Sequence, residues 1–541
     1  MSEFNLIDEP WIPCIDFDGK QVPLGIRDTL LKARELREIC DDSPLVTVAI
    51  HRLLLAILYR AFQGPTGMND WKALYQAGSF ESDNRLSEYL KNWSPRFYLF
   101  DDKYPFYQMA GLSTKKAVSV NRLATECASG NNATLFDHSG DDDEVVWSLP
   151  YTARQLIACQ SFALGFGKSG NAVINGVEEQ LPYSADAIGL RGMCVWMQGE
   201  NLFDTLMVNL SFIQPDTEPP WELDDPNRDR DRQEGKDRHT VRSRGTLDRF
   251  TWQSRLVRLI PKGNMVSKTY FTQGRSADKS RGDPMKVYRA SKKEGVSALP
   301  LSSGKAAWRD SHSILMIPPP DSNEQRPECF NLLARARNER LLDENPQFIV
   351  HVVGLASAPN KAGKFLLWRH ERMPVPTALL SDVNLIDRLG NLIQNAENAA
   401  DELNRRTRRI AKLYLAPNAE SPEGGQPDKD EVTRITESID PRPAYWARLE
   451  QHFYTLLENL PNDWDSANGD WKPDDQQTAT NTWRTHIKRE ARRALEESIK
   501  SLGATARAIQ AVARVRTDFN DDDLKPKQQK SDKTKEGKKR K

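Results

Sequence analysis

The residues most suited to chemistry in this sequence are a lysine and several glycines between Ser161 and Gly176. Gly165, Gly167 and Gly170 surround Lys168. Because glycine has no Cβ and accepts positive φ, neighbouring N–H groups can converge on a phosphate or enter a narrow groove. The pattern indicates contact with a polyanion. The alternative is a flexible turn where a helix ends.

The sequence Gly167-Lys168-Ser169 invites comparison with a nucleotide-binding P-loop. That motif requires a glycine five residues before Gly167, and Phe162 stands there. The preceding residues have apolar side chains at helical spacing, whereas a P-loop follows a buried strand. The sequence therefore predicts a loop that leaves a helix, and a nucleotide hydrolase is kept only as an alternative.

Length and composition indicate a large globular protein with no cofactor or metal site. The 541 residues are enough for two or three domains, and 76 Lys and Arg balance 76 Asp and Glu. The longest apolar run, residues 44–59, is interrupted by His51 and Arg52, so no membrane segment is predicted and a cytoplasmic location is expected. The cysteines form no CxxC pair, which favours reduced thiols and argues against zinc; they are Cys14, Cys40, Cys127, Cys159, Cys194 and Cys329.

With no net charge overall, any binding to nucleic acid would depend on local basic patches. Residues 262–293 contain nine Lys and Arg and only two Asp. The tail from Lys525 to Lys541 is also lysine-rich and nearly devoid of apolar residues, which predicts disorder. A solubilising extension is the alternative for the tail. Segment 262–293 is thus the first candidate for phosphate contacts.

Hydrophobic spacing predicts an α+β chain with two folded parts. Strand-like and helical segments alternate through residues 1–375, which predicts a mixed α/β globular domain; within it, Ser43-Pro44 begins a core helix, and 347–354 and 365–369 form a hairpin. In residues 376–516, apolar side chains recur every three or four positions in four segments, which predicts a four-helix bundle. Residues 517–541 are then a basic, disordered tail.

Several short motifs along the chain carry little information singly but form a specific ordered set. They are Phe4–Pro13, Ser43-Pro44 with Arg52–Ala56, Pro105–Gln108, Gly165–Gly167, Thr251–Gln253, Trp368–Glu371 and Tyr445–Phe453. In this order they resemble the CasA family, the large subunit of the type I-E CRISPR surveillance complex Cascade. The resemblance extends over nearly the whole chain.

This resemblance implies a mixed α/β N-terminal domain followed by a C-terminal four-helix bundle. In such proteins the subunit recognises the protospacer-adjacent motif (PAM) in duplex DNA, promotes strand opening for guide RNA pairing, and recruits a helicase–nuclease. It is not an enzyme and needs no cofactor. The implied partners are double-stranded target DNA, the guide RNA-containing Cascade subunits (backbone, small and 5′-end-capping subunits) and the helicase–nuclease. A protein-binding scaffold that does not read DNA directly is the alternative.

By position, the resemblance implies three loops and one lysine that contact DNA. The residues are Asn131, Asn132, Thr134, Leu135 and Phe136 of a first loop; Gly165, Phe166, Gly167, Lys168, Ser169 and Gly170 of a glycine loop; Lys268; and Asn360, Lys361, Ala362 and Gly363 of a strand-separating hairpin. Lys361 and Ala362 stand where the family often has an amide wedge, and Asp137 where a neutral side chain is common. The sequence therefore does not predict which PAM is preferred.

Overall fold

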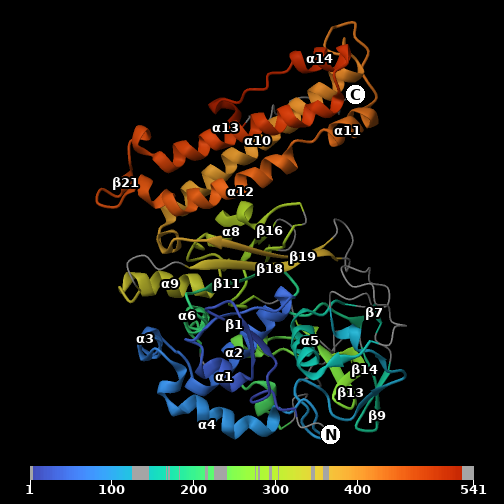
Figure 1. The fold of residues 1–541 in the computed structure, drawn as a ribbon, viewed down its shortest axis with the longest axis vertical. Helices are drawn as coiled ribbons and strands as arrows, with labels where there is room; N and C mark the ends of the chain where they lie inside the picture. The colour runs from blue at the N-terminus through green and yellow to red at the C-terminus, as the bar shows by residue number, and fades with distance from the viewer. Residues whose placement is uncertain are drawn as a thin grey trace, which may run out of the picture. The chain divides into compact units, whose positions relative to one another are not determined.

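The computed structural model describes residues 4–124, 145–165, 167–168, 171–181, 183–213, 217–224, 240–274, 276–277, 281–291, 295–302, 304–342, 348–357 and 365–526. Contacts divide the chain into two compact units, Met1–Ser381 and Asp382–Lys541. The first contains helices and small sheets, and the described part of the second is mainly helical (Figure 1). The mixed helix and sheet character predicted from the sequence is confirmed.

The first unit is built around helix α2 (Pro44–Phe62), the predicted core helix. Ser43 is its N-cap and Pro44 begins its first turn, where a missing N–H breaks no hydrogen bond. The helix packs against α4 (Asn84–Trp93), α5 (Leu149–Phe162) and further elements. Within the described residues α2 is the one helix long and apolar enough to span a membrane, and 94% of that window is buried inside the protein. Its apolar surface therefore faces protein.

Short strands and helices surround α2. Near the N-terminus a sheet has the order β2-β1-β3, and its first two strands turn at Gly19, which has φ +78°. A second sheet has the order β4-β8-β9. The bounds are β1 Ile12–Asp16, β2 Gln21–Leu24, β3 Leu36–Ile39, β4 Leu112–Thr114, β8 Asn171–Ile174, β9 Val177–Gln180, α1 Ile26–Leu31, α3 Met68–Ala77, α6 Leu202–Asn209, α7 Thr246–Phe250, α8 Ser311–Leu315 and α9 Glu328–Asn338.

A third sheet contains the predicted hairpin. Its order is β11-β18-β19, with bounds Cys194–Gln198, Ile349–Ser357 and Phe365–Pro374. Strands β18 and β19 pair antiparallel until Ser357 lies opposite Phe365. The two predicted strands are confirmed. Two small pairs also belong to the unit: β12 (Thr240–Val241) with β15 (Ser276–Ala277), and β16 (Tyr288–Ser291) with β17 (Gly295–Ala298).

Two histidines form a buried hydrogen-bonded chain across this sheet. The amide nitrogen of Gln198 donates to Glu38 (3.2 Å), so its oxygen faces His351 Nε2 (2.6 Å) and accepts. His351 Nδ1 is then free to accept from His370 Nε2 (2.9 Å). Burial lowers the pKa of His351 to about 2 and the pKa of His370 to about 4. Both rings are neutral in the folded protein at neutral pH.

Mild acid is therefore expected to destabilise the first unit before its carboxylates titrate. The folded pKa values lie below the unfolded value of about 6.5, so this stability is fully present above pH 6.5 and is lost as pH falls toward 4. Between pH 6.5 and 5 the His351 ring alone should cost about 2 kcal/mol, from about 1.4 kcal/mol per unit. Urea unfolding across this range measures the effect. His351→Gln should flatten the pH dependence; a slope equal to that of the unchanged protein would contradict the assignment.

The second unit is organised by three long helices. Helices α10 (Val383–Leu415), α12 (Arg442–Asn459) and α13 (Thr478–Ser498) contact one another, and α14 (Ala506–Ala513) packs on α10. Apolar side chains at the predicted spacing are fully or nearly fully buried, among them Leu389, Leu403, Phe453, Ile487 and Leu495. Helices therefore occur at all four predicted places. A two-residue strand pair, β20 (Trp464–Asp465) with β21 (Asp470–Trp471), lies between α12 and α13.

The stretch from Pro417 to Pro443, whose prolines and glycines predict a loop between the first two helices of this unit, contains one more helix. Helix α11 (Lys429–Ser438) packs on α10, and the Asp428 side chain accepts hydrogen bonds from the first two N–H groups that follow Lys429. Only Val432 of this helix is buried. The loop prediction is wrong here because a single buried position gives no helical periodicity.

Residues 517–526, predicted as part of a disordered tail, are packed on α10. Arg406 of α10 donates to the carbonyls of Arg516 (3.1 Å) and Asp518 (2.9 Å), and its guanidinium lies 4.0 Å from the centre of the Phe519 ring. Phe519 and Leu524 are buried. The prediction is wrong for residues 517–526, because two apolar side chains suffice to hold them on α10. Residues 527–541 lie outside the described residues.

The sequence predicts a domain boundary after residue 375. In the structure the first compact unit ends at Ser381, six residues later.

Candidate nucleic-acid interface

Strand β14 (Met265–Gln273) joins the described parts of the candidate site. It pairs along one edge with β13 (Arg255–Lys262) and along the other with two short strands, β5 (Val118–Ser119) and β6 (Trp147–Ser148). Lys268 is exposed and lies opposite Ser119 in this register, and Val266 lies opposite Trp147. One strand therefore pairs with residues on both sides of segment 125–144, at Ser119 and at Trp147.

The first predicted loop belongs to that segment. Asn131, Asn132, Thr134, Leu135 and Phe136 lie outside the described residues, so their contacts stay a prediction. The stems of their segment are nonetheless set by backbone pairing with β14. Lys268 and the two short strands that flank this segment, which lie more than one hundred residues apart in sequence, thus share β14.

The glycine loop, residues 163–170, starts where helix α5 ends at Phe162. The prediction that these glycines leave a helix is confirmed. The Gly165 N–H donates to Asp186 Oδ1 at 3.0 Å, and Gly167 and Lys168 form β7, which pairs with β10 (Tyr183–Ser184). Phe166, Ser169 and Gly170 lie outside the described residues. A P-loop needs a strand before its glycines, and the helix found there excludes that reading.

Arg255, which the sequence did not point to, holds the start of the glycine loop. Its side chain is 1% exposed, and Nη2 donates to the carbonyls of Leu164 (2.8 Å), Ala185 (2.8 Å) and Ala163 (3.2 Å). The carbonyls of Ala163 and Leu164 lie just beyond the C-terminal end of α5, where a cation is favoured. Burial lowers the pKa of Arg255 to about 10, so it stays charged at neutral pH.

Two buried glutamines complete the network around Arg255. Gln160 of α5 accepts from the Arg255 N–H (2.9 Å) and donates to the Arg255 carbonyl (3.0 Å) and the Tyr107 carbonyl (3.0 Å). Gln273, at the end of β14, accepts from Arg255 Nη1 and from the Ala185 N–H, both at 3.1 Å. Gln273, the last residue of β14, thus helps to hold Arg255 and Ala185 in place. Lys268 lies five residues earlier on the same strand.

The segment around Gly189 packs closely against the last turn of helix α5, just before the glycine loop. The Gly189 N–H donates to the Ser161 carbonyl at 2.8 Å, and a Cβ at position 189 would lie 2.5 Å from that oxygen. Contacts below 3.0 Å do not occur for real Cβ atoms, so a side chain here would push the segment away from α5. Glycine at position 189 is therefore required for this packing.

The basic segment 262–293 is not one surface patch. Lys268 and Arg281 are exposed, but Lys286 and Arg289 are buried. Lys286 donates to the carbonyls of Ile188 and Arg191, and Arg289 donates to four backbone carbonyls, among them that of Ser313. The patch prediction is wrong for these two residues because their charges satisfy backbone carbonyls in the interior. Arg275, Lys279, Lys292 and Lys293 lie outside the described residues.

The predicted strand-separating tip also lies outside the described residues. The role of this tip, Asn360, Lys361, Ala362 and Gly363, stays a prediction, although the strands on either side of it, β18 and β19, are described.

In the part of the chain that the structure describes, no group of three His, Cys, Asp or Glu side chains could hold a metal ion.

The chain is similar to CRISPR-associated proteins over nearly its full length. The CRISPR-associated protein CasA/Cse1 of Thermus thermophilus is 29% identical over 523 residues, covering 96% of this chain and 97% of that protein. A crystal structure of Thermus thermophilus CasA matches with a TM-score of 0.76 and 27% identity, covering 95% of this chain and 97% of that one. A chain of a structure described as a CRISPR RNA-guided surveillance complex shares the fold, with a TM-score of 0.68, 19% identity and coverage of 95% and 98%.

The family model for CRISPR-associated protein Cse1 matches residues 5–494. This span includes α2, strand β14 with Lys268, the glycine loop and the three long helices of the second unit, α13 up to its last turn. The match thus covers the first unit from residue 5 onward and the long helices of the second unit. The chain therefore belongs to the Cse1 family of CRISPR-associated proteins.

Proposed function

We propose that this protein is the non-catalytic, DNA-reading large subunit of a type I-E Cascade complex. In this role it recognises a PAM in duplex DNA, promotes strand opening for guide RNA pairing, and recruits a helicase–nuclease. Membership of the Cse1 family supports a place in a CRISPR complex. The shared fold of a chain from an RNA-guided surveillance complex agrees with it.

The observation that carries the proposal is the convergence of three candidate elements on β14. Lys268 lies on this strand, two short strands that flank segment 125–144 pair with it, and Gln273 at its end accepts from Arg255, which holds the start of the glycine loop. From Lys268 to Gln273 the strand spans about 17 Å at ~3.4 Å per residue. That length matches about five base pairs at ~3.4 Å each. This part of the strand is thus long enough to lie along a short DNA motif.

A short reader is sufficient because RNA-guided complexes delegate sequence recognition to base pairing. A glycine backbone and one lysine suit the minor groove, which is narrow and carries a degenerate code. Recognition of this kind tolerates several related motifs. The residues Asn360 to Gly363 would then act beside the motif, where a hairpin tip that fills the space of a base pair stabilises the opened duplex.

The remaining parts of the proposal concern partners and the second unit. We assign the second unit as a four-helix bundle formed by α10, α12, α13 and α14. Its partners, and those of the first unit, are the guide RNA-containing backbone, small and 5′-end-capping subunits. In this proposal the DNA-reading domain ends at Ser381, the bundle lies within the second unit, and residues 527–541 form the basic tail.

Replacing Lys268 by alanine should weaken duplex binding in a salt-dependent way. A lysine that contacts one phosphate releases a counterion on binding, so its removal should flatten the slope of log affinity against log salt by about 0.9. The measurement is a titration of guide-loaded complex with target duplex at several salt concentrations. Lys91→Ala, which removes an exposed lysine of α4, is the matched control. An unchanged slope for Lys268→Ala would place that side chain away from phosphate.

A further inference from the structure

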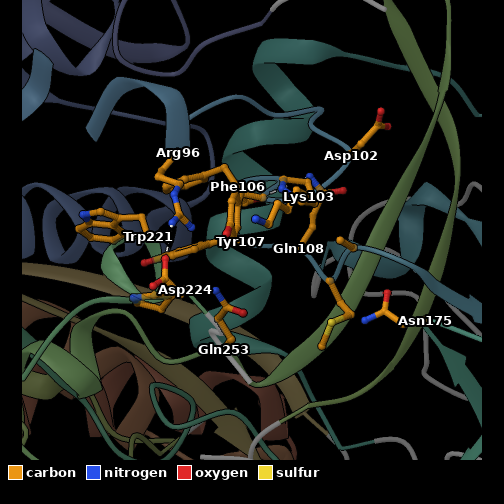
Figure 2. A pocket seen from close by; sticks show the side chains of 15 residues that line it. Arg96, Asp102, Lys103, Phe106, Tyr107, Gln108, Asn175, Trp221, Asp224 and Gln253 are labelled. Atoms are coloured by element: carbon orange, nitrogen blue, oxygen red, sulfur yellow. Dashed lines mark hydrogen bonds and ion pairs between the residues drawn. The ribbon is translucent and has the colours of Figure 1, made fainter. Parts of the chain in front are cut away.

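Two of the sequence motifs meet at a pocket that the proposed function does not use. The pocket has a volume of about 440 Å³ and lies in the first unit (Figure 2). Pro105–Gln108 line it together with Gln253, the last residue of the motif Thr251–Gln253. Its size is in the range of ligand sites in proteins, about 300–1,000 Å³. Motifs far apart in sequence therefore build one concave surface.

The aromatic wall of the pocket is rigid before anything binds. The Arg96 guanidinium lies 3.4 Å from the centre of the Tyr104 ring, and Arg96 is itself fixed by the Leu223 carbonyl (3.1 Å) and Asp224 (3.2 Å). The Tyr104 N–H donates to Asp101 Oδ1 at 2.6 Å. Behind them Phe106 stacks on Tyr107 with ring centres 4.5 Å apart, and Trp221 packs against both.

Tyr107 supports the wall in a strained conformation. Its φ is +55°, in the left-handed region that bulky residues seldom adopt, at a cost of about 1–3 kcal/mol. The Tyr107 carbonyl accepts from Gln160, the same glutamine that bonds the backbone of Arg255. Strain of this kind is typical of functional sites. Gln160 thus connects the pocket wall, at Tyr107, to Arg255, which holds the start of the glycine loop.

The polar groups of the pocket favour a neutral planar ligand over a cluster of phosphates. Two cations, Arg96 and Lys103, are balanced by Asp102 and Asp224. The Gln253 and Asn175 side chains also line the pocket. Figure 2 labels both side chains; Gln253 is half-buried, and Asn175 is exposed in the turn between β8 and β9. Amide side chains are suited to reading the hydrogen-bonding edge of a base.

We propose that this pocket binds one unstacked base of single-stranded nucleic acid. The base packs against the Tyr104–Arg96 stack, Gln253 and Asn175 bond its edge, and Lys103 contacts the adjoining phosphate. Stacking on aromatic rings and guanidinium groups is how proteins hold single-stranded bases. The inference rests on the proposed nucleic-acid function, and it adds a site for an unpaired strand to the duplex-reading elements around β14.

The test uses the full chain alone and two short single-stranded DNAs. One is abasic at every position except a central 2-aminopurine, and the other is abasic throughout. The chain should bind the first DNA about tenfold more tightly and quench its fluorescence, because stacking of one base is worth about 1–3 kcal/mol. Equal affinity for the two DNAs would overturn the proposal.

Variants separate the pocket from general effects on folding. Tyr104→Ala removes the stacking ring and should lose most of the preference for the base-containing DNA; Gln253→Leu keeps the side-chain size but removes the amide and should lose part of it, and Tyr104→Phe should keep it. Gln76→Leu, at an exposed site of α3, is the matched control, and thermal unfolding midpoints verify that each variant folds. If Gln253→Leu retains the preference but weakens assembly with other subunits, the pocket takes a protein side chain and the proposal fails. Because no duplex or PAM is involved, this failure is distinct from failure of the proposed function.

Discussion

Replacing Arg255 by methionine is expected to release the glycine loop and to destabilise the first unit. The change leaves the half-buried Leu164 and Ala185 carbonyls without the donor they have here, and an unsatisfied group out of reach of water costs about 1–3 kcal/mol. We expect the free energy of unfolding to fall by about 3–5 kcal/mol. Hydrogen exchange at residues 163–165 and 185–187 should increase beyond the level that global unfolding explains.

The neighbouring Arg258 provides the control for this prediction. It lies on the same strand, is exposed, and makes a hydrogen bond of 3.3 Å to the Leu112 carbonyl. Arg258→Met should change the free energy of unfolding by less than about 0.5 kcal/mol. In guide-loaded complex, Arg255→Met should also reduce motif-dependent duplex binding. Unaltered exchange in the loop with Arg255→Met would show that the loop is held by other contacts.

The second large effect is expected at the ion pair that α2 makes through Arg52. Arg52 and Asp283 are both fully buried, with nitrogen–oxygen distances of 3.2 and 2.9 Å, and Arg52 also donates to the Arg249 carbonyl. Removing one partner leaves the other charge buried and unpaired, which costs about 3–5 kcal/mol. Arg52→Leu should therefore lower the free energy of unfolding by this amount, as measured in urea.

Two further variants define the source of that loss. Adding Asp283→Asn to Arg52→Leu removes the stranded charge, so the double variant should be less destabilised than the sum of the single changes. Arg27→Leu removes an ion pair of similar length, 2.8 Å to Asp8, at the surface, and should cost less than about 1 kcal/mol. If the two single changes at positions 52 and 283 simply add, the pair does not act as a unit.

Long elements with regular spacing could be predicted from the sequence. Helix α2 begins at the predicted Ser43-Pro44 cap, and α10, α12 and α13 follow stripes of apolar residues every three or four positions. Short elements could not. The apolar run from Ser313 to Ile317 favours a strand by its pattern, but Ser311–Leu315 form α8, because periodicity cannot distinguish the two over so few residues.

The candidate site was predictable only in its exposed parts. Lys268 is exposed on a strand, as a contact residue must be, and Gly165 follows a helix end. Arg255 and Gln160 were missed because their role depends on hydrogen bonds between residues 95 positions apart. The only sequence signal was a polar residue within an apolar pattern, and such a residue is more often exposed, as Arg258 is.

The most direct test of the proposed function is a titration of guide-loaded complex, with and without this chain, on two duplexes that differ only in the motif beside the target. With the chain present, the duplex that carries the correct motif should bind more tightly, since a mismatched base pair in a recognised site costs about 1–3 kcal/mol. Without the chain, the two affinities should be equal. Equal affinities in the presence of the chain, for every motif tried, would contradict a DNA-reading role.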